Sequence, residues 1–320
     1  MGKVQLDVVV IGNIINETIK FPEKSIGPLL GSPAAYSSLV MSAVGAKVGL
    51  VSYYGSDTGE WLDVHLGNVD HSGLIEHERS TTNFLVYRED GTKYVEYVYK
   101  APGIYEKDIP QAYLDCDYFY ICPMDYEVDL SVNKKLYDMG KKVIVDLGGY
   151  GGATSEKHYT IHDEKGDRIL SEVSKYSTIV KASREDLEYI APGLDLESIV
   201  GYFFSKGAKT CVVTLGEKGC YLGKADEKGI YIEGFKSNNP IDFTGAGDSF
   251  GAGFMASFSK NVDIIEAIIF GNSVASLVIE KTGGCIKDRM PSLTDVQNRI
   301  NQQRNERKCE DEKDWSRHYW

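Results

Sequence analysis

The sequence predicts one large α/β domain of three layers, with a mostly parallel central sheet between two layers of helices and a small additional β-sheet. Three observations predict this fold. Short apolar runs recur at the spacing of parallel strands joined by crossover helices. One hairpin pattern interrupts this alternation, and a glycine-rich stretch later opens a helix of small and apolar residues. The 320 residues suffice for such a domain with a full core.

The boundaries follow from where these patterns begin and end. We assign residues 1–304 to the domain, and the small sheet to about residues 13–30 and 80–106. Residues 305–320 are charged and aperiodic, so we expect a flexible tail outside the core.

The composition indicates a cytoplasmic protein and excludes several classes of partner. A net charge of −12 leaves no basic stripe for a nucleic acid or an anionic membrane. The 6 cysteines are scattered without a Cys-x-x-Cys spacing, which favours reduced, buried thiols over zinc or disulfides. No apolar run approaches the ~20 residues of a membrane span. We therefore expect a soluble protein without a nucleic-acid or membrane partner.

The first elements meet at one edge of the predicted sheet. Leu6 to Ile11 is a short apolar run, typical of a buried parallel strand. Asn16 follows at its carboxyl end, where open α/β sheets place their ligands. Gly31 to Leu39 opens a helix of small residues, and Lys47 to Tyr53 forms the next strand.

The hairpin consists of Thr82 to Tyr87 and Tyr94 to Tyr99, which alternate as strands do. They flank a turn that contains Asp-Gly, a strong hairpin signal. Its tyrosines either pack across the strands, contact a ligand or cover an interface, and the pattern leaves these roles open.

Strands and helices alternate again after residue 117. The predicted strands are Tyr118–Cys122, Lys142–Asp146, Thr178–Lys181 and Lys209–Thr214, and the predicted helices include Leu130–Met139, Leu196–Ser205 and Ile264–Glu280. The glycine-rich loop 146–152 lacks the Lys-Ser/Thr ending of a phosphate loop, so we give it no catalytic role.

The segment 242–251, DFTGAGDSFG, carries the clearest chemistry. Where Gly245, Ala246 and Gly247 open a helix, backbone N–H groups are left unpaired and the helix dipole favours an anion. Asp248 in the first turn is placed to take a proton from a group beside that anion. An anion site next to a general base is what phosphoryl transfer to a hydroxyl requires. The alternative is a glycine-rich turn in which Asp248 only caps the helix.

These ten residues resemble the signature of the ribokinase (PfkB-type) carbohydrate kinases, Asp-Thr-x-Gly-Ala-Gly-Asp-x-Phe. The resemblance implies a ribokinase-like fold, with Asp248 as general base and the backbone of Gly245, Ala246 and Gly247 as the anion hole. It implies ATP and Mg²⁺ as cofactors and a small-molecule alcohol as substrate. In this family the hairpin forms a lid over the substrate and often builds a dimer, so we expect a homodimer through the lid.

Two segments resemble nucleotide-site motifs of the family. Ser183 to Asp186 is similar to an Asn-x-x-Glu motif, which implies that Ser183 and Asp186 contact the nucleotide site and that Glu185 or Asp186 holds Mg²⁺ through water. The same spacing predicts a capping box, and the two roles are compatible. Thr214 to Gly219 resembles the nucleotide loop, which implies contacts from Thr214, Gly216 and Gly219 to ATP.

The resemblance also implies two sites near the C-terminus. Asn272 lies in a helix that relatives place beside the adenine, so it is a candidate nucleotide contact. The loop Thr282 to Gly284 lies where relatives bind a monovalent cation such as K⁺, for which Asp242 and Thr244 are candidate ligands.

The resemblance places the acceptor against Asn16, Gly31, Ser32 and Tyr36, together with Asp248. Ser32 replaces a glycine of the family pattern, Asn16 replaces an aspartate, and Tyr36 replaces a substrate-binding asparagine. An amide lacks the charge that strengthens hydrogen bonds of a carboxylate to hydroxyls. The ring of Tyr36 would add a flat apolar wall. We therefore expect a hexose, cyclitol or similar polyol ahead of a nucleoside or free ribose.

Two other functions stay open. One is a nucleoside kinase on the same scaffold. The other is a non-catalytic ligand-binding protein that kept the fold, which the altered residues at Ser183 and Asp186 favour and the intact Gly245 to Asp248 segment disfavours.

Overall fold

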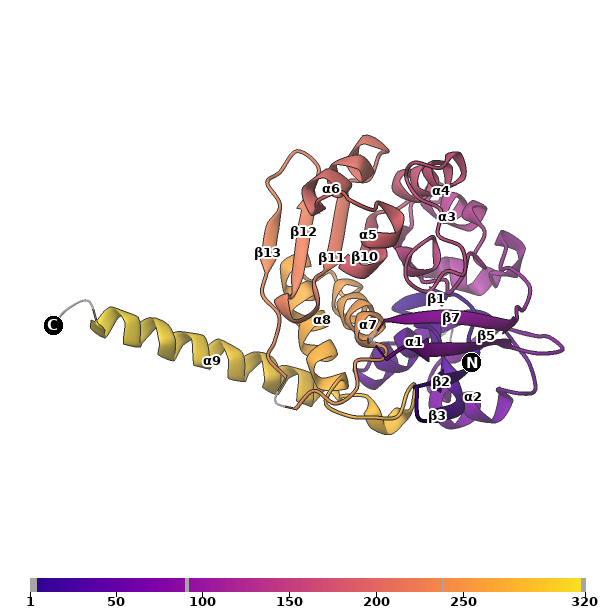
Figure 1. Ribbon diagram of the computed structural model, residues 1–320, viewed down its shortest axis with the longest axis horizontal. Coiled ribbons are helices and arrows are strands. Elements are labelled where there is room, and N and C mark those ends of the chain that lie inside the picture. The colour runs from indigo at the N-terminus through magenta and orange to yellow at the C-terminus, as the bar shows by residue number, and fades with distance from the viewer. Residues whose placement is uncertain (1–4, 90–91, 238, 318–320) are drawn as a thin grey trace.

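The computed structural model describes residues 5–89, 92–237 and 239–317, with side chains up to residue 306. The chain folds around a nine-stranded sheet (Figure 1). In spatial order its strands are β13 (Ile230–Ile232), β12 (Cys220–Lys224), β11 (Thr210–Thr214), β10 (Ile179–Ser183), β9 (Lys142–Asp146), β8 (Tyr118–Ile121), β1 (Val8–Ile11), β4 (Val48–Tyr54) and β5 (Asp70–Glu76). From β11 to β5 all neighbours pair in parallel, whereas β12 and β13 add an antiparallel edge.

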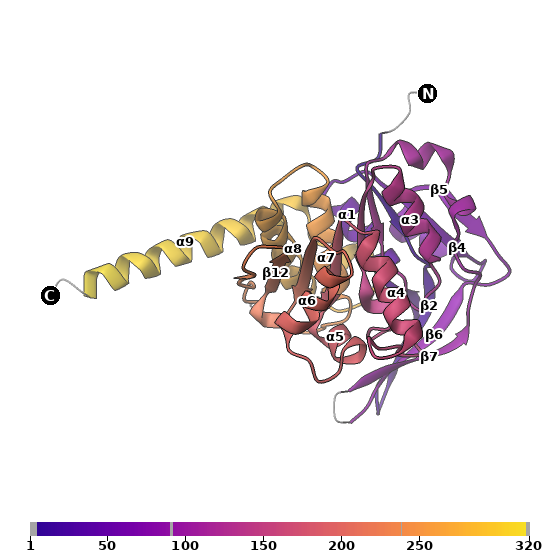
Figure 2. The ribbon, with the colours of Figure 1, turned by 90° about the horizontal axis from the view of Figure 1, so that it is seen from above.

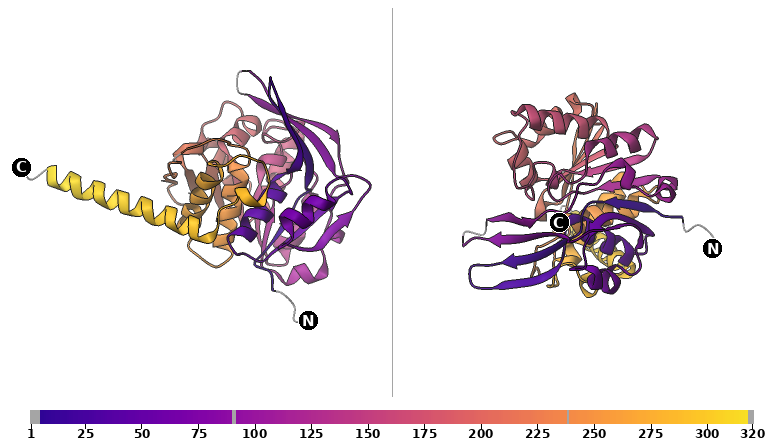
Figure 3. Two further views of the ribbon diagram at one scale, coloured as in Figure 1. Left: turned by 90° about the horizontal axis from the view of Figure 1, so that it is seen from below. Right: turned by 90° about the vertical axis from the view of Figure 1, so that its right-hand side faces the viewer.

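A second sheet of four strands forms the lid. Its order is β3 (Ser25–Gly31), β2 (Ile15–Lys20), β6 (Thr81–Tyr87) and β7 (Lys93–Tyr99). The strands β6 and β7 form the predicted hairpin, and β2 pairs with β6 in parallel. Figure 3 shows these strands side by side as a curved layer apart from the main sheet. The predicted mostly parallel sheet with a small β lid is therefore confirmed.

Helices cover both faces of the main sheet (Figure 1). One core contains side chains of α1 (Pro33–Ala43), α2 (Gly59–Leu66), α7 (Ala246–Phe258), α8 (Ile264–Val278) and the start of α9 (Leu293–Arg317). The other contains side chains of α3 (Leu130–Asp138), α4 (Glu164–Lys175), α5 (Arg184–Ile190) and α6 (Leu196–Ser205). Short 3₁₀ helices are η1 (Glu106–Asp108), η2 (Gln111–Asp115), η3 (Leu147–Gly149), η4 (Gly216–Lys218) and η5 (Lys287–Arg289).

The strand β1 shows why the central strands are continuously apolar. Val8 and Val10 pack into the core of α1 and α7, whereas Val9 and Ile11 pack into the core on the opposite face. Successive side chains of a strand point to opposite faces, and here both faces are covered by helices. The four-residue apolar run is thus required by burial on both sides.

The C-terminal segment differs from the expected aperiodic tail. The helix α9 continues to Arg317 and projects away from the body of the protein (Figure 2). Residues 305–317 contain no glycine or proline and are rich in Glu, Arg and Lys, which favour helix. Residues 318–320 lie outside the described part of the chain, and flexibility of the tail stays a prediction. In the described residues, no helix combines the length and apolar character needed to cross a membrane.

Candidate active site

The start of α7 has a backbone shape that only glycine allows. Gly245 precedes the helix with φ of 74°, in the left-handed region. A β-carbon at Gly245 would lie 2.4 Å from Cε1 of Tyr36. The glycine thus satisfies the backbone turn and the close approach of the tyrosine ring at the same time.

The first-turn N–H groups of α7 suit the predicted anion hole in part. The N–H of Ala246 donates to the carbonyl of Phe243 at 3.2 Å. For Gly247 and Asp248, the described residues provide no backbone acceptor outside the helix. Such N–H groups point out of the N-terminal end of a helix, where the dipole is positive. Gly247 and Asp248 are therefore available anion donors. The N–H of Gly245 likewise has no described backbone acceptor outside the helix, and that of Ala246 is engaged.

Asp248 lies at this end of α7, is partly buried and lines the cavity of the site. Burial raises the pKa of its carboxyl to about 6, and the positive charge of Lys181 limits the rise. A carboxyl with a pKa of about 6 is mostly ionised at neutral pH. It is also a stronger proton acceptor than an ordinary aspartate, which suits a general base.

A buried ion pair lies beside Asp248. Nζ of Lys181, in β10, lies 2.6 Å from Oδ2 of Asp146 at the end of β9, and the hydroxyl of Tyr120 donates to the same oxygen at 3.0 Å. Although burial opposes it, the carboxylates of Asp146, Asp186 and Asp248 raise the pKa of Lys181 above its usual range. The ammonium lies 3.8 Å from where a β-carbon of Gly247 would be. Lys181 therefore adds positive charge at the anion hole.

Sequence reasoning missed Lys181 and Asp146. Both lie at the carboxyl ends of neighbouring parallel strands and occupy paired positions in the register. The sequence signal that could have revealed this pair is a lysine inside an otherwise apolar strand, because a buried charge needs a partner of opposite charge.

The lid contributes a carboxylate that differs from the predicted residue. Glu17 in β2 is buried and lines the cavity. Its burial, together with the negative charge of Asp248, raises the pKa of Glu17 to about 7. A β-carbon at Gly31 would lie 3.0 Å from Oε1 of Glu17, so the predicted Gly31 makes room for this carboxylate.

Asn16 does not reach the cavity, and its placement as a substrate ligand is wrong. Successive residues of β2 point to opposite faces, so Asn16 points away from Glu17. Its amide donates instead to Oδ2 of Asp57 at 3.3 Å.

Asn83 is a second lid residue that the sequence did not reveal. It is paired with Glu17 in the parallel β2–β6 register and is fully buried. Among the described residues, neither side-chain atom of Asn83 has a hydrogen-bond partner. Asn83 does not itself line the cavity, but its amide is close enough to the Glu17 carboxyl to lower the pKa of that group. Asn83 therefore supports Glu17 from the neighbouring strand.

Ser32 and Tyr36 lie at the start of α1 and line the cavity. Ser32 caps the helix by accepting from the N–H of Ala35 at 3.1 Å, with φ of 102°. Glycine adopts a positive φ more readily than other residues, which accounts for the glycine that the family pattern has at this position. Tyr36 is only 2 % exposed, and its hydroxyl accepts a hydrogen bond from Arg289 at 3.1 Å. The ring of Tyr36 therefore packs against Gly245 at the start of the anion hole. It does not form the open apolar wall that we expected.

Glu185 and Asp186, the residues expected at Mg²⁺, line the cavity, as does Ser183, and Asp186 forms the predicted capping box with Ser183. Ser183 accepts from the N–H of Asp186 at 3.0 Å, and Asp186 accepts from the N–H of Ser183 at 2.7 Å. The other carboxylate oxygen of Asp186 accepts from Ala153. Glu185 lies 3.2 Å from Nζ of Lys93 in the lid.

The residues expected at ATP divide into two groups. Thr214 and Gly216 line the cavity. Gly219 does not: its φ is 92° and a β-carbon there would lie 2.2 Å from the carbonyl of Ile232, so it serves the β11–β12 turn. Asn272 also lies outside the cavity, where its amide donates to the carbonyl of Glu233 at 3.3 Å.

Together these elements enclose a cavity of about 610 Å³ between the main sheet and the lid. The start of α7 and the carboxyl ends of β9, β10 and β11 form its floor. The lid adds the side chains of Glu17, Leu85, Tyr87, Lys93 and Val95. In the described part of the chain, no cluster of three or more His, Cys, Asp or Glu is placed to bind a metal directly.

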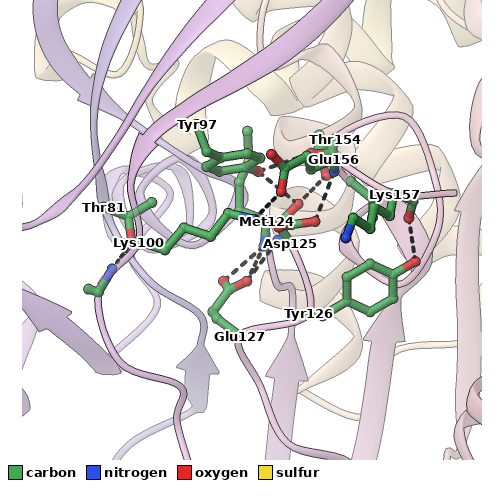
Figure 4. A network of polar contacts seen from close by, with 12 residues as sticks. Thr81, Tyr97, Lys100, Met124, Asp125, Tyr126, Glu127, Thr154, Glu156 and Lys157 are labelled. Atoms are coloured by element: carbon green, nitrogen blue, oxygen red, sulfur yellow. Dashed lines mark hydrogen bonds and ion pairs between the residues drawn. The ribbon is translucent and has the colours of Figure 1, made fainter.

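The base of the lid is fixed to the cavity wall by a polar network (Figure 4). The hydroxyl of Tyr97 in β7 lies 2.9 Å from the carbonyl of Thr154 and 3.2 Å from that of Met124, and both of these residues line the cavity. Lys100 forms ion pairs with Asp125 and Glu156. Movement of β7 is therefore coupled to the wall of the site.

The fold and this constellation define a phosphotransferase that acts on a small molecule. A sequence model of the pfkB family of carbohydrate kinases matches residues 6–291. The chain therefore belongs to the pfkB family and is a kinase.

Relatives and solved structures agree with this assignment. The cytidine kinase of Thermococcus kodakarensis is 31% identical over 87% of this chain and 98% of its own length. The inositol 3-kinase of Arabidopsis thaliana is 25% identical over 86% of this chain and 74% of its own. The structure of Arabidopsis thaliana ribokinase complexed with ribose and ATP has a TM-score of 0.74 and 19% identity, covering 93% of this chain and 99% of the other. A putative ribokinase II from E. coli in complex with ATP and Mg²⁺ has a TM-score of 0.70 and 19% identity, covering 93% and 100%.

Proposed function

We propose that this kinase transfers the γ-phosphoryl group of ATP to a hydroxyl of a sugar, cyclitol or related polyol, with Asp248 as general base. One observation carries the proposal. A single cavity of about 610 Å³ holds Asp248, the N-terminal end of α7 and the lid carboxylate of Glu17. A base, an anion site and a ligand for hydroxyls are thus close enough to act on one bound pair of substrates.

The proposed reaction follows from these positions. The hydroxyl oxygen of the acceptor forms a bond to the γ-phosphorus while the bond from that phosphorus to the β–γ bridging oxygen breaks. The proton of the hydroxyl passes to Asp248, and the electron pair of the broken bond leaves with ADP. The N–H groups of Gly247 and Asp248 and the ammonium of Lys181 stabilise the negative charge on the transferred group.

The residues present fit Mg²⁺ held through water. Glu185 and Asp186 line the cavity. Glu185 is half exposed, and its carboxylate keeps acceptor positions besides its contact with Lys93. These two residues would hold the hydrated ion, and a bound Mg²⁺ neutralises part of the triphosphate charge.

A nucleoside is a second candidate acceptor, and specific observations favour it. The preference for a hexose relied on an amide at Asn16 and an open ring at Tyr36. Asn16 does not line the cavity, and Tyr36 lines it but is only 2 % exposed. Glu17 supplies a carboxylate to the cavity, and the amide of Asn83 lies beside it on the neighbouring strand. A carboxylate supported by an amide suits a vicinal diol such as that of ribose.

The lid also offers an apolar surface that a base would need. The side chains of Leu85, Tyr87 and Val95 line the cavity on the same side as Glu17. The T. kodakarensis relative is a cytidine kinase, which adds support for this candidate.

ADP release with ATP and Mg²⁺ tests both candidates in one experiment. The panel contains hexoses, myo-inositol, ribose, cytidine, adenosine and other nucleosides. With GTP or pyrophosphate as the alternative donor, the phosphorylated acceptor is measured directly, because these donors release no ADP. Turnover of at least one polyol supports the kinase, and the largest kcat/KM identifies the class. Absence of turnover with every acceptor and donor would favour the non-catalytic ligand-binding protein. Asn83→Leu should raise KM for a nucleoside or ribose at least ~10-fold if the amide supports Glu17 in binding a diol.

A further inference from the structure

The guanidinium of Arg289 lies in a cage of oxygen atoms beside the anion hole. Its Nε lies 2.9 Å from the carbonyl oxygen of Lys281 and 3.3 Å from that of Val278. Nη1 donates to the carbonyl of Gly284 at 3.2 Å, and Nη2 donates to that of Asp242 at 2.8 Å. The Asp242 carboxylate lies 3.6 Å from Nη2. The side chain of Arg289 is fully buried.

Such a cage is the environment that a hard metal cation prefers. Backbone carbonyls and a carboxylate surround a single positive charge, and the C-terminal end of α8 adds the negative end of a helix dipole. The cage contains Asp242, which was expected to bind a monovalent cation together with the loop 282–284. The residues present do not fit that cation, because the carbonyl of Asp242 and that of Gly284 already accept hydrogen bonds from Arg289. A second positive charge there would be repelled by the buried guanidinium.

Two contacts connect Arg289 to the anion hole. The first runs through Tyr36, whose hydroxyl accepts from Nη1 and whose ring lies against Gly245. The second runs through Asp242, whose carbonyl accepts from Nη2 and whose carboxylate accepts from the N–H of Thr244 at 2.9 Å. Gly245 and Thr244 are the residues that immediately precede α7.

We propose that the guanidinium of Arg289 takes the place of a bound monovalent cation. It positions the anion hole and makes the enzyme independent of K⁺. Arg289 touches neither the cavity nor the reacting atoms, so it is a positioning residue. The proposal deepens the proposed function, since it concerns the same anion hole, but it does not depend on which acceptor is used.

The first measurement compares kcat of the wild type in KCl, NaCl and tetramethylammonium chloride at equal ionic strength. We expect kcat to agree within about 2-fold, because the cage needs no exchangeable ion. A 10-fold or greater activation by K⁺ would overturn the proposal.

The second measurement uses Arg289→Met, which keeps an unbranched apolar stem but removes the guanidinium and its positive charge from the cage. In tetramethylammonium chloride kcat should fall at least ~10²-fold, with KM for the acceptor changed less than 3-fold because Glu17 and the lid are untouched. Added K⁺ or guanidinium should restore kcat at least ~10-fold. Unchanged kcat, or a loss that neither cation restores, would show that Arg289 has no such role.

Arg299→Met is the matched control. Arg299 pairs with Glu280 at 3.0 Å and contacts Ser276, but it has no described contact with the 242–245 segment. Its kcat should not respond to K⁺. If Arg289→Met fails to fold, Arg289→Lys is tested in its place. Lysine retains the positive charge but has fewer hydrogen-bond donors than arginine. We expect K⁺ to activate this variant at least 3-fold.

The melting temperature separates this proposal from the proposed function. K⁺ should raise the melting temperature of Arg289→Met, and not that of the wild type, relative to tetramethylammonium. This readout needs no turnover, so the cage can be tested even if no acceptor is found. A K⁺-dependent increase in the wild type would contradict the proposal.

Discussion

At the scale of the residue, Asp248 combines burial with nearby positive charge. Replacement by Asn keeps the shape of the side chain but removes the proton acceptor. We expect Asp248→Asn to lower kcat at least ~10²-fold with the fold retained. The measurement is ADP release under saturating substrates, with circular dichroism to compare the folds. Turnover near that of the wild type would remove Asp248 from the mechanism.

The pKa of Asp248 also predicts the pH dependence of activity. A general base acts in its ionised form, and burial raises the pKa of this carboxyl to about 6. Activity should therefore rise with pH through about 6 and level off above about 7, with kcat/KM falling roughly 10-fold per pH unit below 5. A flat profile between pH 5 and 8 would be inconsistent with this assignment.

Glu17 provides a prediction about how stability changes with pH. Stability should fall with rising pH, whereas activity should rise. Its pKa is raised from 4.5 to about 7 by burial and by Asp248, so the folded state holds a proton that the unfolded state releases between these values. The stability of the wild type should thus fall as pH rises from about 4.5 to 7. Glu17→Gln lacks this loss, so its stability relative to the wild type should increase over that range, by up to about 3 kcal/mol.

Denaturant titrations of both proteins at several pH values measure this difference. Glu96→Gln is the matched control, because Glu96 lies on the solvent-facing side of β7 and is exposed. A difference that stays constant with pH for Glu17→Gln would show that Glu17 is not held in its protonated form.

Asn16 and Glu17 also show where prediction from sequence stopped. The resemblance located the end of the first strand correctly, but the choice between neighbours depends on which face of β2 turns to the cavity. That face is fixed by pairing of β2 with β6, some 60 residues later in the chain. Asn83 and Lys181 were missed for a related reason, since burial and partners are properties of the assembled sheets.

At the scale of the element, the six central strands of the main sheet were predicted, whereas its edge strands β5, β12 and β13 and the lid connections were not. Apolar runs predicted β1, β8, β9 and β11 because burial on both faces demands them. The polar network that fixes β7 joins residues from distant loops, and no local pattern marks it.

Tyr97 offers a test of that network. Tyr97→Phe removes the hydroxyl shared by the carbonyls of Met124 and Thr154 and leaves the ring in place. We expect faster hydrogen exchange in 93–99 and a 3- to 10-fold rise in KM for the acceptor, because each lost bond contributes about 1 kcal/mol. Tyr94→Phe, on the exposed side of the same strand, is the control. Equal effects of both substitutions would argue against a lid anchor.

At the scale of the whole molecule, the outer face of the lid predicts self-association. The side chains of Tyr94 and Val98 are 40% and 49% exposed, and the register of the lid places Val86 opposite Tyr94. Glu96 lies between Tyr94 and Val98 on this face, so the exposed apolar side chains surround a charge. We expect a partner related by two-fold symmetry to cover these apolar side chains. The homodimer through the lid therefore stays a prediction, and Val86, Tyr94 and Val98 define the surface that it would use.

Sedimentation of the wild type should show a dimer at micromolar concentration. Val98→Glu places a charge on this surface and should raise the dimer dissociation constant at least ~10-fold, since a buried unpaired charge is costly. Met139→Glu alters an equally exposed side chain after α3, away from the lid, and should leave the dimer intact. A wild-type monomer at micromolar concentration would contradict the lid-mediated dimer, as would equal weakening by both substitutions. Because β7 carries Lys93 and Val95 into the cavity from its other face, loss of the dimer should also raise KM for the acceptor.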